Sequence, residues 1–94
     1  MRYAPYLIAF RTTSMETQQE VISWLRERSA VHVLDDVWFL ESDHLMAGDI
    51  AEDLKSHRQI DGPLVVLKLN AATDWSLEGT SEQVVSWVRA NLGS

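Results

Sequence analysis

The order of the short apolar segments most constrains how this chain can fold. Four runs rich in β-branched and aromatic residues predict strands, and residues at helical spacing follow the first and the third of them. We place the strands at residues 6–12, 31–34, 37–40 and 64–69. The resulting order, β-α-β-β-α-β and then a C-terminal helix, predicts an α+β fold of the ferredoxin-like type.

Local signals place the helices and one turn. A hydroxyl followed three residues later by Glu or Gln is typical of a capping box, and it occurs at residues 17–20 and 80–83. We expect the first helix to end near Ser29 and the middle helix to span residues 45–58. Only Asp35-Asp36 separates the second and third strands, which predicts a tight hairpin.

Both faces of the predicted sheet are apolar. In the last strand Leu64 and Val66 point one way, while Val65, Leu67 and Leu69 point the other way. The two crossover helices cover one face. The C-terminal helix is narrow for the second face of a four-stranded sheet, and monomers rarely expose so large an apolar patch. We therefore expect a homodimer, the commonest symmetric assembly.

Composition limits the classes of function. The 94 residues suit one small domain, residues 1–94. Zero cysteines exclude disulfides, thiolate metal sites and cysteine nucleophiles. A net charge of −6 argues against nonspecific electrostatic binding to nucleic acid or to anionic membranes. The apolar start is too short for a signal peptide, and no run approaches ~20 apolar residues, so we expect a cytoplasmic protein. We expect no cofactor.

Three polar residues near the hairpin are candidates for catalysis. His32 lies between two valines of a predicted strand, where it is either a hydrogen-bonded, partly buried side chain or a general base. Asp35 and Asp36 form a polar turn, or else they hold a divalent cation or share a proton.

Other chemical patterns favour structural roles. Asp49, Asp53 and His57 share a helix face, but the first and last are two turns apart, roughly 12 Å, so one ion cannot bind all three. We expect a solvated acidic face and no metal site. The four tryptophans are better suited to anchor the core or a dimer than to stack on bases.

Basic residues are concentrated early in the chain. Residues 1–34 contain four arginines and three glutamates, whereas the rest contains four basic and eleven acidic residues. The candidates for nucleic-acid binding are Arg2, Arg11, Arg26 and Arg28, because the first strand and the first helix are neighbours and could cluster them. The alternative is ordinary helix-end and surface charge.

The run His-Val-Leu-Asp-Asp-Val-Trp-Phe-Leu at residues 32–40 resembles a family of short bacterial proteins labelled SinR-like. The resemblance continues through residues 64–69, Trp75 and the ending Trp-Val-Arg-Ala-Asn-Leu at 87–92. That family is similar to the small CRISPR-associated endonuclease and to VapD-type ribonucleases. The resemblance implies a ferredoxin-like homodimer.

The resemblance also implies where catalysis would be found. The CRISPR-associated relatives place an Asp at the end of the first strand, where two copies are thought to hold a divalent metal. Here that strand ends Ala9-Phe10-Arg11-Thr12, and a cation at Arg11 would repel Mg²⁺. We therefore carry over no catalytic residue.

These observations predict a protein that acts by binding a macromolecule, either protein or nucleic acid. One alternative is a small endoribonuclease, metal-dependent or not, that uses His32 with Asp35 or Asp36. Another is an antitoxin-like protein-interaction module whose acidic part covers a basic protein.

Overall fold

The computed structural model describes residues 3–44 and 46–92. These form seven elements in the order β1 (Ala4–Phe10), α1 (Met15–Glu27), β2 (Val31–Leu34), β3 (Val37–Ser42), α2 (Ala47–Ser56), β4 (Leu64–Lys68) and α3 (Glu82–Leu92). This is the predicted order of strands and helices.

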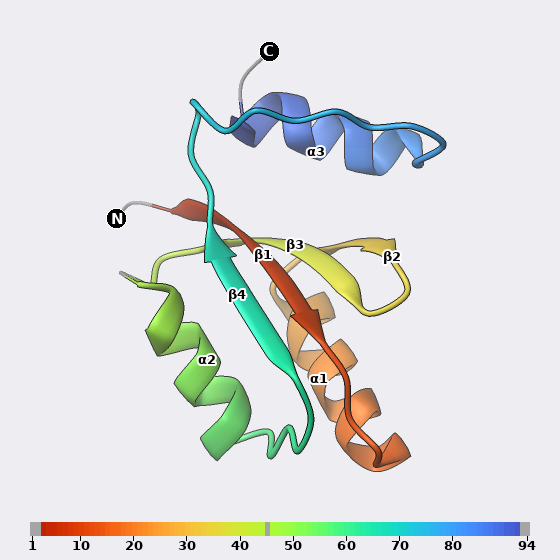
Figure 1. Ribbon diagram of the computed structural model, residues 1–94, viewed down its shortest axis with the longest axis vertical. Coiled ribbons are helices and arrows are strands. Elements are labelled where there is room, and N and C mark those ends of the chain that lie inside the picture. The colour runs from red at the N-terminus through yellow and green to blue at the C-terminus, as the bar shows by residue number, and fades with distance from the viewer. Residues whose placement is uncertain (1–2, 45, 93–94) are drawn as a thin grey trace.

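The four strands form one antiparallel sheet in the order β2-β3-β1-β4. Helices α1 and α2 lie on one side of it and α3 lies on the other (Figure 1). This is the α+β, ferredoxin-like arrangement with a C-terminal helix that the sequence predicts. The two-residue hairpin turn is also confirmed, and Asp35 takes a left-handed φ of 40° in it.

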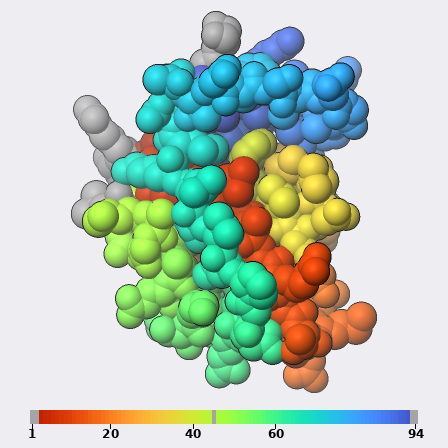
Figure 2. Space-filling model, in the orientation of Figure 1, coloured from red at the N-terminus to blue at the C-terminus, as the bar shows by residue number. Residues whose placement is uncertain are grey.

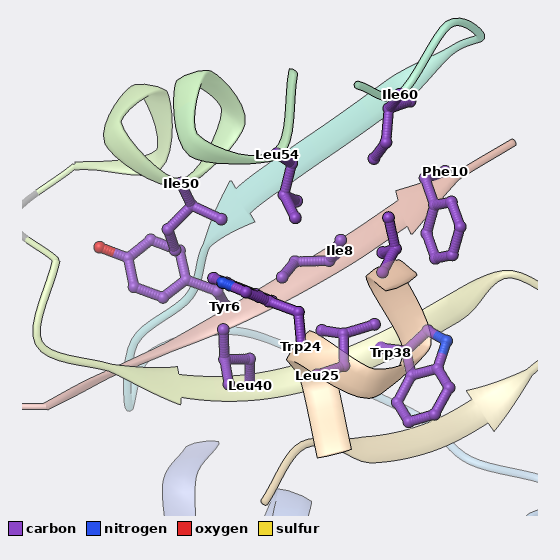
Figure 3. Close-up of a cluster of buried hydrophobic side chains, with 11 residues drawn as sticks. Tyr6, Ile8, Phe10, Trp24, Leu25, Trp38, Leu40, Ile50, Leu54 and Ile60 are labelled. Carbon is purple, nitrogen blue, oxygen red and sulfur yellow. The ribbon is translucent and has the colours of Figure 1, made fainter. Parts of the chain in front are cut away.

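Eleven buried residues form the larger core, between the sheet and helices α1 and α2 (Figure 3). Alternate residues of β1 and β3 point into it. The helices complete it on the other side, with Trp24 and Leu25 from α1 and Ile50 and Leu54 from α2. The predicted alternation is therefore confirmed on this face. The strand residues concerned are Tyr6, Ile8, Phe10, Trp38 and Leu40.

A smaller core lies on the second face. It contains Val31 and Phe39 from the sheet and Val84, Val88 and Leu92 from α3. The Phe39 and Trp87 rings stack with their centroids 4.6 Å apart. Leu69, Trp75 and Leu77 of the segment that leads to α3 pack against the same cluster. The C-terminal part of the chain thus covers one half of this face.

Several element ends differ from the predictions. β1 begins and ends two residues earlier than expected, because Arg11 and Thr12 already belong to the loop toward α1. Ser14 caps α1, and its hydroxyl accepts from the Thr17 N–H, so the predicted box at 17–20 is wrong. The helix ends at Glu27 rather than near Ser29.

The ends of the other two helices also differ from the predictions. Helix α2 ends at Ser56, before the predicted Arg58, and the predicted start at Leu45 lies outside the described residues. Ser81 caps α3 by accepting from the Val84 N–H at 3.3 Å, so the cap is one residue later than Thr80.

Gly62, which lies just before β4, packs very closely against the main chain at the end of β1. A Cβ at this position would lie 2.2 Å from the carbonyl oxygen of Arg11. The neighbouring Arg11 N–H donates to the Pro63 carbonyl at 3.0 Å, so this approach belongs to the pairing of the two strands. Only a residue without a side chain fits.

We predict that Gly62→Ala lowers the free energy of unfolding by about 1–3 kcal/mol, because backbone atoms must move to admit the methyl group. Urea denaturation measures this. Gly48→Ala is the matched control: nothing lies within 4 Å of its Cβ position, and its stability should be unchanged or higher by up to about 1 kcal/mol. Equal midpoints for Gly62→Ala and wild type would contradict the prediction.

Candidate functional site at the open end of the sheet

The half of the second face that α3 leaves uncovered exposes apolar side chains. Val65 and Leu67 of β4 are 48% and 51% exposed, and Leu34 at the end of β2 is 54% exposed. Val65 and Val37 both lie opposite Ala9 in the register, so a small residue stands between two larger ones across the sheet. We call this surface, formed by Ala9, Leu34, Val37, Val65 and Leu67, the open half.

A shallow groove runs over the part of the open half nearest the hairpin turn. Ala9, Val37 and Val65 belong to its lining, together with Leu34 and Pro63. The polar residues that line it are Arg11, Asp35 and Asp36. The fold thus brings two of the three catalytic candidates and one arginine candidate to one apolar groove.

Arg11 and Asp36 form a loose ion pair in this groove. Their nearest charged atoms are 3.7 Å apart, and the Arg11 side chain is 79% exposed. A main-chain hydrogen bond also holds the hairpin turn against the end of β1, because the Phe10 N–H donates to the Asp36 carbonyl. A guanidinium beside Asp36 opposes the binding of a divalent cation there. Among the described residues, no group of three or more His, Asp or Glu could hold a metal ion.

His32 stands outside the groove on the other side of the hairpin. Its Nε2 lies 2.7 Å from the Asp35 carbonyl oxygen, and its ring packs on Trp38 at a centroid distance of 4.7 Å. The hydrogen bond of His32 was expected, but the expected partial burial of its side chain is wrong. His32 is exposed because β2 is an edge strand whose register shifts between His32 and Leu34.

The arginine candidates do not form one patch in the described residues. Arg11 precedes α1, whereas Arg26 and Arg28 lie at its far end, roughly 20 Å along the helix axis. The Arg28 guanidinium lies 4.1 Å from the centre of the Trp24 ring and donates to the Trp24 carbonyl. It therefore acts as a helix-end charge. Arg2 lies outside the described residues.

The acidic face of α2 has structural contacts. Asp53 and His57 lie 2.9 Å apart, and Asp49 accepts from the Met46 N–H at the start of the helix. The four tryptophans are buried or half-buried: Trp24 and Trp38 lie in the larger core, and Trp75 and Trp87 pack on the smaller one. The positions of the tryptophans in or against the cores agree with the sequence interpretation.

Sequence reasoning missed the role of Asp61. Its Oδ1 accepts from the Thr12 hydroxyl at 2.6 Å and from the Thr13 N–H, and its Oδ2 accepts from the Thr13 hydroxyl at 2.6 Å. The Thr12 hydroxyl in turn accepts from the Ser14 N–H. These side-chain hydrogen bonds lower the pKa of Asp61 to about 2. Through these hydrogen bonds Asp61 holds in place the loop that follows Arg11.

A second polar cluster, at the other end of the sheet, was also missed. The Tyr6 hydroxyl donates to the His44 carbonyl at 2.8 Å, and the Ser42 hydroxyl is hydrogen-bonded to His44 Nδ1. Burial raises the pKa of Tyr6, and the Asp49 carboxylate adds to that shift. These contacts hold the segment that enters α2. The Tyr6 contact joins residues that are 38 positions apart, so no local pattern in the sequence marks it.

Comparisons with known proteins add no relative. No family model matches the chain, and no curated protein and no solved structure is significantly similar to it. The resemblance to SinR-like proteins and their nuclease relatives therefore remains a prediction. No helix in residues 3–44 and 46–92 is long and apolar enough to cross a membrane.

We predict that Asp61→Ala destabilises the fold near neutral pH and has little effect near pH 2. The pKa is lower in the folded chain than in the unfolded one, so the stabilisation is complete above about pH 4. It is lost as the pH falls toward about 2. Urea midpoints of wild type and variant at pH 7, 4 and 2 measure it. A difference that does not shrink at low pH would contradict this role.

Proposed function

We propose that the protein acts by binding another protein through the open half. The observation that carries this proposal is the contrast within one sheet face: α3 buries one half, while Leu34, Val65 and Leu67 of the other half stay about half exposed. An apolar surface bordered by polar residues is typical of protein-interaction sites. Covering such side chains contributes on the order of 1 kcal/mol each.

The charges around the groove favour a protein partner over nucleic acid. Its single arginine, Arg11, is already beside Asp36, and Asp35 adds a second carboxylate. Phosphates need several unopposed cations, and the whole chain carries a net charge of −6. The expected partner surface is apolar at its centre and basic at its edge, as in the antitoxin-like interpretation. We further propose that the protein works as a homodimer, located in the cytoplasm.

We predict that Val65→Glu and Leu67→Glu abolish retention of the physiological partner from an extract of the native cell. A buried carboxylate should weaken binding by about 10–100-fold or more. Met15→Glu is the matched control, since Met15 is 76% exposed and lies on α1, across the sheet. The affinity is then measured by calorimetry with the purified partner.

Two results would contradict the proposal. One is a partner that Val65→Glu and Leu67→Glu retain as well as wild type. The other is equal loss of the partner in the Met15→Glu control. A partner with an acidic contact surface would contradict the charge argument separately.

An endoribonuclease is the second candidate, because His32 contacts the turn that carries Asp35 and Asp36. His32 Nε2 is engaged by a main-chain carbonyl, and Arg11 opposes a cation at Asp36. We therefore predict no cleavage of labelled single-stranded RNA or double-stranded DNA with Mg²⁺, Mn²⁺ or EDTA. Cleavage that His32→Ala, Asp35→Ala or Asp36→Ala removes, with the fold intact, would establish the enzyme instead.

A further inference from the structure

Asp61 and Gly62 form a pair of residues that favours a slow covalent rearrangement. Glycine has no side chain to shield its amide nitrogen, so a preceding carboxyl group can react with that nitrogen. Asp61 is the only Asp or Asn of the sequence that glycine follows. Its side chain is exposed, so water reaches it. This position is therefore the one at which the rearrangement is expected.

The reaction has two steps and needs no reactant besides water. In the first, the Gly62 nitrogen bonds to Cγ of Asp61, and the carboxyl OH leaves as water with the amide proton, which closes a five-membered succinimide ring. In the second, water adds to one ring carbonyl and breaks its bond to the nitrogen. Opening at Cγ restores aspartate. Opening at the main-chain carbonyl leaves iso-aspartate, in which the main chain runs through the former side chain.

The folded structure opposes the first step. The Thr12 and Thr13 hydroxyls donate to different oxygens of the Asp61 carboxylate, each at 2.6 Å, so this group is not free to turn toward the Gly62 nitrogen. The loop after β1 and the segment before β4, orange and green-teal in Figure 2, lie against each other. The same bonds hold the pKa of Asp61 at about 2, so the neutral acid, which loses water readily, is rare at neutral pH.

The product does not fit the place that Asp61 occupies. Iso-aspartate adds one carbon–carbon bond, about 1.5 Å, to the main chain just before Gly62. Gly62 has no room for such a shift, because a Cβ there would lie 2.2 Å from the Arg11 carbonyl oxygen. Arg11 and Pro63, which are joined by a main-chain hydrogen bond of 3.0 Å, both line the groove of the open half. Conversion at this position therefore disturbs the edge of that groove.

We infer that Asp61 is a modification site at which the chain converts slowly to iso-aspartate, and that its hydrogen bonds to Thr12 and Thr13 set the rate. The reaction proceeds during the fraction of time in which these bonds are open. Conversion loosens the contact between the end of β1 and the start of β4. This inference goes beyond the proposed function and does not depend on the identity of the partner.

The rate of conversion in the folded and the unfolded chain tests the inference. The full chain is incubated at neutral pH with and without guanidinium chloride, and iso-aspartate is located by electron-transfer fragmentation, since its mass equals that of aspartate. We expect conversion at position 61 in both samples, slower by about tenfold or more in the folded chain. Equal rates, or no conversion at position 61 in either sample, would overturn the inference.

A threonine variant tests the role of the hydrogen bonds separately. Thr13→Val keeps the shape of the side chain and removes the hydroxyl that donates to Asp61. Conversion in its folded state should be roughly fivefold faster than in wild type, because one hydrogen bond to a carboxylate no longer opposes opening. Thr80→Val, which removes a hydroxyl just before α3, is the matched control and should convert at the wild-type rate. Equal rates for folded Thr13→Val and wild type would overturn the inference.

The effect of the product is measured on wild type after long incubation. The converted fraction, separated by chromatography, should unfold at a lower urea concentration than the unconverted fraction of the same sample. Equal midpoints would overturn the proposed loosening of the two strands. Partner retention is measured on freshly purified protein, so a failure of this inference leaves the proposed function standing, and the reverse also holds.

Discussion

A sheet that is apolar on both faces is the constraint on which the rest of this structure depends. Strand side chains alternate, so Tyr6 and Ile8 enter one core while Leu7, between them, packs with the other. Each face must be covered, and the chain has two helices for the first and one for the second. The open half follows directly from that imbalance.

The sequence was a good guide wherever a local pattern determines the structure. Strand alternation, the Asp35-Asp36 turn and the spacing of apolar helix residues predicted the order of the elements and the pairing of β2 with β3. Helix ends were less reliable, because Ser14 and Thr17 both suit a cap and only the path of the preceding loop selects Ser14. The extent of cover by α3 could not be deduced, since it depends on how the segment between β4 and α3 crosses the sheet.

The candidate site was predictable only in part. Arg11, Asp35 and Asp36 were identified as polar residues near strand ends, but their meeting in one groove with Val65 depends on pairing across the sheet. Asp61 was missed because Thr12 and Thr13, which it binds, lie nearly fifty residues away in the chain. An Asp-Gly-Pro turn is a common loop signal and indicates nothing about distant partners. Exposure of His32 likewise depends on a register shift that no local pattern marks.

Helix α3 contributes to only one of the two cores. The larger cluster of eleven buried residues contains none from α3, whereas α3 supplies three of the five in the smaller cluster. Docking of α3 is therefore nearly separable from the folding of the sheet and its first two helices. A chain that lost this helix would keep its principal core, and on the second face only Leu69, Trp75 and Leu77 would remain to cover the sheet. The area of apolar surface that the molecule offers is in this sense set by one helix.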